Sequence, residues 1–151
     1  MAGVSGSVCH APVQPTEESV SAFLKDCHAT WMRWFEKEIE ARCNATGSSL
    51  EIIADVLEEG IEDRPRFGLA FMNIDAEVEA FNTEAVVIAT EQKEQVRGFL
   101  EQLAVRMGLE HPDIAASAAV LVIERTIVWA LTGRLNVAQN AHLLFQCLKH
   151  S

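Results

Sequence analysis

Residues 113–132 read DIAASAAVLVIERTIVWALT, and this stretch decides the fold class. It is apolar on almost every side of a helix, and twenty helical residues rise about 30 Å. A helix that is apolar all round is buried on all sides or lies in a membrane. Glu124 and Arg125 stand inside it, and charges in the middle of a membrane span are costly. We therefore expect the central helix of a soluble domain, with the charged pair facing an interior cavity or a second subunit.

The composition sets limits on the class of protein. A chain of 151 residues has the length of one domain, and its 49% hydrophobic content fits a chain that also buries area against a copy of itself. A net charge of −10 at pH 7, with no basic run, argues against nucleic-acid contact by the chain itself. Residues 1–15 lack the basic start and apolar core of a signal peptide, so we expect a cytoplasmic protein. The four cysteines lack metal-ligand spacing, and we expect neither a metal nor a cofactor.

Residues 1–15 are rich in Gly, Ser, Pro and Ala and predict a flexible leader, followed by a single helical domain over 16–150. Thr16 is a suitable cap for a first helix, whose apolar residues recur at helical spacing as far as Ile39. Gly47 is suited to ending that helix in a left-handed conformation.

Hydrophobic periodicity predicts the other helices, and no stretch reads as a strand. Ser48 and Glu51 have the spacing of a capping box, Gly108 is a terminator, and Asp113 and Asn136 are expected caps. The expected helices are 50–63, a brief one within 67–81, 82 or 83 to 107, 113–132 and 137–149. The fold class is therefore all-α, a bundle of five to six helices.

Two segments carry a family resemblance. Residues 68–77 read GLAFMNIDAE, which is similar to a Gly-x-x-Phe-x-Asn segment before a long helix. A small-residue helix with an acidic residue, Glu124, then leads through 129–134 (WALTGR) to a last amphipathic helix. In this order the chain resembles, over roughly residues 16–150, the C-terminal ligand-binding and dimerisation domain of the tetracycline-repressor (TetR) family of transcriptional regulators.

One part of the family's pattern is missing from this sequence. The family begins with a three-helix DNA-binding head that contains a helix-turn-helix, whereas residues 1–15 are too short for it and the first helix is acidic. We therefore expect either a truncated or a naturally headless form, which contacts DNA only through a domain that this sequence lacks.

The resemblance implies a homodimer in which the last two helices of each subunit form a four-helix bundle. The candidate interface residues are Ala115, Ala118, Val122, Ala141, Leu144, Phe145 and Leu148. Alternatively, the central helix lies in the core of a monomer.

The resemblance also implies a ligand inside the bundle, and aromatic and Met walls with a few polar anchors are typical of small-molecule sites. The candidate ligand-binding residues are Trp31, Trp34, Phe35, Phe67, Phe71, Met72, Glu124, Arg125 and Trp129. Alternatively, the apolar members are ordinary core residues, and Glu124 and Arg125 form structural salt bridges within the fold or across the dimer. His28 adjoins the apolar stripe and is expected to be a structural residue at its boundary.

The sequence bears on three classes of function. The first is a dimeric sensor domain of a transcriptional regulator, whose ligand is small and apolar or amphipathic. The second is an enzyme, which we do not expect because the sequence has no nucleophile elbow, phosphate loop or metalloprotease motif. The third is a headless interaction protein that dimerises with a full-length regulator and sequesters it.

Overall fold

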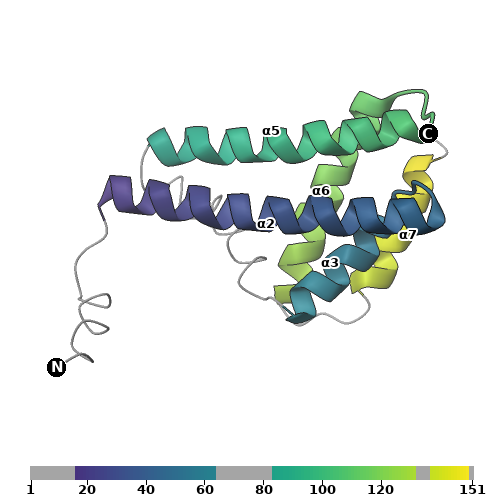
Figure 1. Ribbon diagram of the computed structural model, residues 1–151, viewed down its shortest axis with the longest axis horizontal. Helices are drawn as coiled ribbons and strands as arrows, with labels where there is room; N and C mark the ends of the chain where they lie inside the picture. The colour runs from purple at the N-terminus through teal and green to yellow at the C-terminus, as the bar shows by residue number, and fades with distance from the viewer. Residues whose placement is uncertain (1–15, 64–82, 132–136, 150–151) are drawn as a thin grey trace.

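The computed structural model describes residues 16–63, 83–131 and 137–149, which form five α-helices and no strand (Figure 1). The helices are α2 (Glu17–Thr46), α3 (Glu51–Asp63), α5 (Thr83–Arg106), α6 (Pro112–Leu131) and α7 (Val137–Lys149). The all-α prediction is confirmed for these residues. The predicted leader, the brief helix within 67–81 and the expected cap Asn136 lie outside the described residues.

Local hydrogen bonds form both predicted ends of α2. The hydroxyl of Thr16 accepts a hydrogen bond from the backbone N–H of Ser19 at 3.1 Å, which satisfies one of the free donors of the first turn. At the other end Gly47 has a φ of 90°, and its N–H donates to the carbonyl of Cys43 at 2.8 Å. Only glycine adopts such a φ without strain, so this position ends the helix.

Two predicted caps are corrected. At the start of α3 it is Ser49, not Ser48, whose hydroxyl accepts the N–H of Glu51 at 3.3 Å and donates to the Glu51 carboxylate. The central helix α6 begins at Pro112, with the N–H of Ala115 donating to the carbonyl of His111 at 3.0 Å. Proline suits the first helical position because no N–H is needed there, and Asp113 therefore lies in the first turn instead of capping it.

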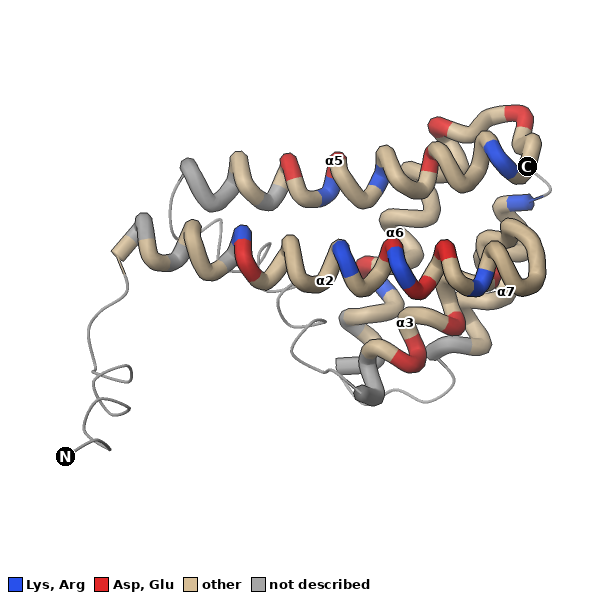
Figure 2. Tube along the Cα trace, viewed as in Figure 1, with Lys and Arg blue, Asp and Glu red and all other residues tan. Residues whose placement is uncertain are grey.

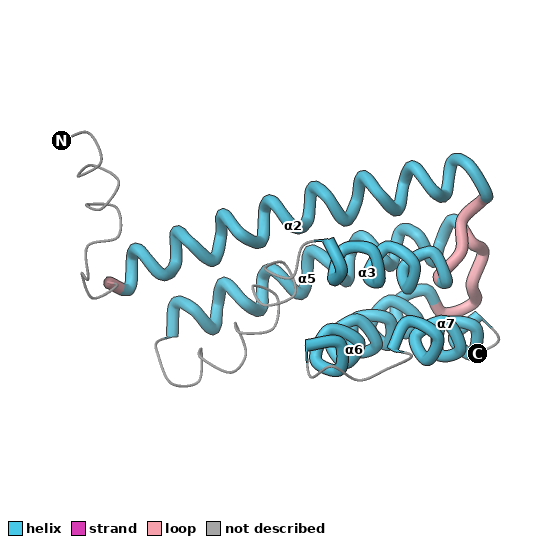
Figure 3. Tube along the Cα trace, turned by 90° about the horizontal axis from the view of Figure 1, so that it is seen from below, coloured by secondary structure: helices cyan, strands magenta, loops and turns pink. Residues whose placement is uncertain are grey.

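The two longest helices, α2 and α5, lie side by side and run in the same direction (Figure 1). Two side-chain contacts between them have nearly the same sequence offset, as a parallel pair requires. His28 contacts Gln95 and Glu40 contacts Arg106, with offsets of 67 and 66 residues. Figure 3 shows α6 and α7 on the far side of α3 and α5 from α2.

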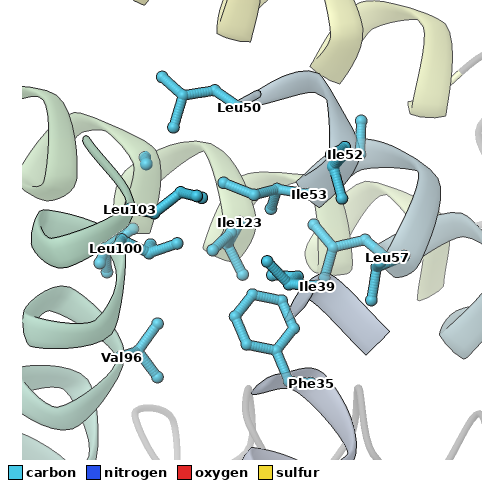
Figure 4. Close-up of a cluster of buried hydrophobic side chains, with 14 of the residues drawn as sticks. Phe35, Ile39, Leu50, Ile52, Ile53, Leu57, Val96, Leu100, Leu103 and Ile123 are labelled. Atoms are coloured by element: carbon cyan, nitrogen blue, oxygen red, sulfur yellow. The ribbon is translucent and has the colours of Figure 1, made fainter. Parts of the chain in front are cut away.

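The hydrophobic core lies toward the C-terminal ends of α2 and α5, where all five described helices contribute buried side chains. Figure 4 shows Phe35 of α2, Ile53 of α3, Leu100 of α5 and Ile123 of α6 pointing toward one another, and all four are fully buried. The helix α3 comes so close to α2 that a Cβ atom on Gly60 would lie 2.2 Å from the Trp34 indole. Glycine at this position is therefore what permits the approach.

The central helix α6 is buried on one side only. Ala116, Ala119 and Ile123 are fully buried against neighbouring helices, whereas Ile114 and Leu121 are 61% and 67% exposed. The expectation that this helix is buried on all sides is therefore wrong for the single chain. Its second apolar side faces away from the core because α5, α3 and α7 occupy only one side of it. No described helix combines the length and the apolar character that crossing a membrane requires.

Two polar contacts join α7 to α3 in antiparallel order. His142 Nε2 donates to the Asp55 carboxylate at 2.7 Å, and the Lys149 ammonium lies 2.6 Å from the Glu51 carboxylate. Burial disfavours the charged form of Glu51, but hydrogen bonds from Lys149 and Ser49 outweigh it and lower the pKa of this carboxyl. The last helix is thereby fixed along α3 as well as along α6.

Candidate functional site

An aromatic row runs along α2 and across to α5. The rings of Trp31 and Phe35 stack with centroids 4.6 Å apart, and the edge of Phe99 meets Phe35 at 6.1 Å. His28 stacks on the other side of Trp31 at 6.3 Å. The α2 members are three and four residues apart and so share one helix face. We call His28, Trp31, Phe35 and Phe99 the aromatic row.

A polar seam continues the aromatic row toward the N-terminal ends of α2 and α5. Ser21, His28 and Gln92 are almost fully buried there, and His28 Nε2 donates to the Gln95 side-chain oxygen at 2.9 Å. The Ser21 hydroxyl has no hydrogen-bond partner among the described residues. A buried hydroxyl group without a hydrogen-bond partner is less stable than one in water. The seam therefore contains a polar group whose hydrogen-bonding capacity is unused by the described residues. We call Ser21, His28, Gln92 and Gln95 the polar seam.

Burial determines the protonation state of His28, the titratable member of the polar seam. Desolvation lowers the pKa of His28 below its ordinary value, and this effect outweighs the hydrogen bond to Gln95, which acts in the opposite direction. At neutral pH the imidazole is therefore uncharged, and the seam consists of neutral donors and acceptors. Such groups suit a neutral polar group of a small molecule better than an ion.

The aromatic pocket candidates lie in different surroundings. Trp31 and Phe35 are buried in the core, where each packs on the other. Trp34 is half-buried beside Gly60 of α3, and Trp129 is half-buried on α6. The remaining candidates, Phe67, Phe71 and Met72, lie outside the described residues. Among the described candidates, Trp31 and Phe35 lie in ring contact, and Phe99 completes their row.

The adjacent charges Glu124 and Arg125 point in different directions. The Glu124 carboxylate pairs with the Lys93 ammonium of α5 at 2.8 Å, and both side chains are about three-quarters buried. Arg125 is exposed, and it has no ion-pair partner among the described residues. The alternative of a salt bridge within the fold is therefore what the structure shows for Glu124, and Arg125 lies on the surface.

The candidate interface residues divide into two groups. Ala115, Ala141 and Phe145 are buried within the chain itself, with 4%, 1% and 0% of their surface exposed. Within the single chain they have almost no exposed surface left to bury against a second copy. Ala118, Val122 and Leu148 are half-buried, and Leu144 is exposed. The reason is that the apolar stripe of α7 faces α6 and α3 within the same chain.

Other apolar side chains are exposed on the same two helices. Ile114 and Leu121 lie on α6, and Leu143 and Leu144 of α7 are 55% and 48% exposed. The helices α6 and α7 pack against each other in antiparallel order (Figure 1). We call Ile114, Leu121, Leu143 and Leu144 the C-terminal apolar surface. Of these four, only Leu144 was among the residues predicted for the interface.

Several contributors to these sites were missed from the sequence. Ser21, Gln92 and Gln95 are polar residues within helical patterns, and such residues normally indicate a solvent-facing side. Lys93 is similarly inconspicuous, although it neutralises Glu124. The only signal was the polar interruption of the 83–106 helix at residues 90–95, which does not reveal that part of it faces α2.

The described charges form no obvious ligand set. Figure 2 shows acidic and basic residues interleaved along α2, and acidic residues without basic ones on α3. Within the described part of the chain, no three His, Cys, Asp or Glu side chains gather in a way that could hold a metal ion. The features that remain as candidates for function are thus the polar seam beside the aromatic row and the C-terminal apolar surface.

Comparison of the chain with protein-family models, with curated proteins and with solved structures found no match. The resemblance to TetR-family domains accordingly remains a prediction from the sequence, and the function is argued from the geometry described above.

Proposed function

We propose that this chain is a homodimerising sensor domain of the kind found in TetR-like transcriptional regulators, which binds a small apolar or amphipathic molecule and makes no contact with DNA itself. The observation that carries the proposal is the C-terminal apolar surface. Four large aliphatic side chains stand about half or more exposed on two neighbouring helices of one small chain. Clusters of this kind on monomers typically mark interaction sites.

The physical reason is the exposure of aliphatic surface to water. Burying the exposed part of a leucine side chain contributes roughly 1 kcal/mol, and an isologous dimer buries each such residue twice. Scattered exposed leucines would need no explanation, but these four belong to helices that pack together. A second copy of the chain is the simplest partner that covers them.

The sensing part of the proposal is supported by the polar seam. The buried Ser21 hydroxyl has no hydrogen-bond partner among the described residues and lies on the same face of α2 as the aromatic row, so it offers a hydrogen bond to a ligand whose body is apolar. Because His28 is held neutral, the ligand's polar group would be neutral as well. An alcohol, ketone or amide on a flat apolar skeleton fits this description.

Sedimentation velocity of the full chain tests the dimer. We expect a dimer at micromolar concentration, and we expect Leu121→Asp to weaken it by roughly a hundredfold, since interface substitutions at central apolar residues often cost 2 kcal/mol or more. Val105→Asp is the matched control, because Val105 is 60% exposed on α5 and lies outside the C-terminal apolar surface. A monomer at all micromolar concentrations would contradict the dimer, and an equal effect of both variants would contradict its assignment to this surface.

A thermal-shift screen with neutral hydrophobic metabolites and dyes tests the sensor. A ligand at a hundred times its Kd stabilises the folded state by about 2.7 kcal/mol. Ser21→Ala should leave the protein folded but reduce the shift, whereas Ser48→Ala, at an exposed position between α2 and α3, should leave the shift unchanged. A dimer that no compound stabilises would favour the alternative function, an interaction protein that sequesters a full-length regulator.

A further inference from the structure

The exposed side of α6 carries charged residues at its two ends and uncharged residues of different size between them. Asp113, Ile114, Ser117, Leu121 and Arg125 are all exposed. At about 100° per residue they occupy roughly one third of the helix circumference, so they share one face. An acid stands at the N-terminal end, a base at the C-terminal end, and two large apolar residues with a small one lie between. We call these five residues the outer α6 face.

Neither charge at the ends of this face has an ion-pair partner in the described part of the chain. No described residue forms an ion pair with Asp113 or with Arg125, whereas the adjacent Glu124 is neutralised by Lys93. The two unpaired charges are twelve residues apart, a rise of about 18 Å along the helix. They are therefore too far apart to neutralise each other in one copy of the chain, and each can accept a partner from another.

We propose that two copies pair through their outer α6 faces in antiparallel orientation, with Asp113 of each copy opposite Arg125 of the partner subunit. This inference rests on the homodimer proposed above and adds its orientation and register. In an isologous interface, if residue i meets residue j, then j also meets i. Ala119 lies midway between the two charges, so a two-fold axis level with Ala119 forms both ion pairs at once.

The same register also fits the shapes of the side chains. An axis level with Ala119 places Ser117 of one copy opposite Leu121 of the other, so that a small residue faces a large one twice. A parallel arrangement in register would instead place Asp113 beside Asp113 and Arg125 beside Arg125, and like charges held together disfavour association. The outer α6 face is thus complementary to its own reversed copy, which is why the occupant is a second copy of this chain.

Charge reversal in the full chain tests the orientation. Asp113→Arg and Arg125→Asp should each weaken the dimer by roughly tenfold to a hundredfold, because each creates two like-charge contacts across the axis. The double variant Asp113→Arg with Arg125→Asp should restore the wild-type Kd to within about threefold, since both ion pairs are re-formed in reversed order. Sedimentation velocity at low and high salt measures the Kd, and the wild-type dimer should weaken as salt rises.

Matched controls carry the same charge changes elsewhere. Glu91→Arg on α5 and Lys37→Asp on α2 are both exposed and should leave the Kd unchanged. Circular dichroism and urea unfolding check that every variant is folded, which is expected because all four positions are exposed. If the wild type is dimeric but neither single reversal weakens it, or the double variant fails to restore it, the proposed register is wrong while the homodimer stands. If the wild type is monomeric throughout, the homodimer itself is wrong and the register with it.

Discussion

Both sides of α6 carry large apolar residues, and these residues have opposite surroundings in the fold. Ala116, Ala119 and Ile123 on the inner side are fully buried against other helices of the same chain. Ile114 and Leu121 on the outer side are more than half exposed, and both lie on a face that ends in unpaired charges. Large apolar residues on a helix therefore do not by themselves distinguish its buried side from its exposed side. The charges also differ: Glu124 pairs with Lys93 of α5, whereas the exposed Arg125 has no ion-pair partner among the described residues.

Truncating one residue on each side of α6 should separate the two roles most clearly. Ile123→Ala removes a fully buried side chain and should lower the free energy of unfolding by about 2–5 kcal/mol. Leu121→Ala removes an exposed side chain of the same size and should change the free energy of unfolding of the monomer by less than about 0.5 kcal/mol, while it should weaken the proposed dimer. Urea unfolding at concentrations well below the dimer Kd measures the first quantity, and sedimentation measures the second. If both variants lower the free energy of unfolding of the monomer equally, the outer side of α6 is as buried within the chain as the inner side, which would contradict the structure.

The next largest effect is expected from a pair of glycines. Gly60→Ala should destabilise the protein by about 1–3 kcal/mol, because the added methyl group would lie within 2.2 Å of the Trp34 ring and would push α3 away from α2. Gly98→Ala on α5 meets no atom within 4 Å, so it should instead stabilise the helix by about 0.5–1 kcal/mol. Thermal unfolding of both variants against the wild type gives the comparison. A stabilising Gly60→Ala would show that α2 and α3 are not in close contact.

The smallest expected effect is the pH dependence of stability that comes from the buried His28. Burial lowers the pKa of His28 below its ordinary value of 6.5, so the unfolded chain takes up a proton at a pH where the folded chain does not. Stability should therefore be unaffected by this group above about pH 7, fall as the pH drops below it, and stop falling beneath the folded-state pKa. The contribution is at most about 1.4 kcal/mol per pH unit.

His28→Gln is the variant that isolates this contribution. It keeps an amide donor for Gln95 and removes the titration, so the decline in stability between pH 7 and pH 5 should be shallower than in the wild type. Urea unfolding at several pH values measures both slopes. Identical slopes would show that His28 is equally easy to protonate in the folded and unfolded chains.

Much of the fold was predictable because local patterns carried it. Thr16 and Gly47 bound α2 through contacts within a few residues of the chain, and the apolar spacing gave the extents of α3, α5 and α7 closely. The cap at Ser48 was wrong by one residue because Ser49 competes for the same Glu51 N–H. The start of α6 at Pro112 was not predicted. Proline both breaks a helix and favours the first helical position, and here it takes that first position.

The candidate sites were predicted less well, since they depend on contacts between distant residues. The sequence alone determined the helical class of the described residues, both ends of α2 and the net negative charge, because each follows from spacing and composition. Only the tertiary structure decided that Phe145 faces the core and Leu143 the solvent, that Glu124 meets Lys93, and that Ser21 is buried. These outcomes depend on which side of each helix faces its neighbours. A helix with apolar residues on both sides has no single apolar stripe, so its sequence does not indicate which side faces the core.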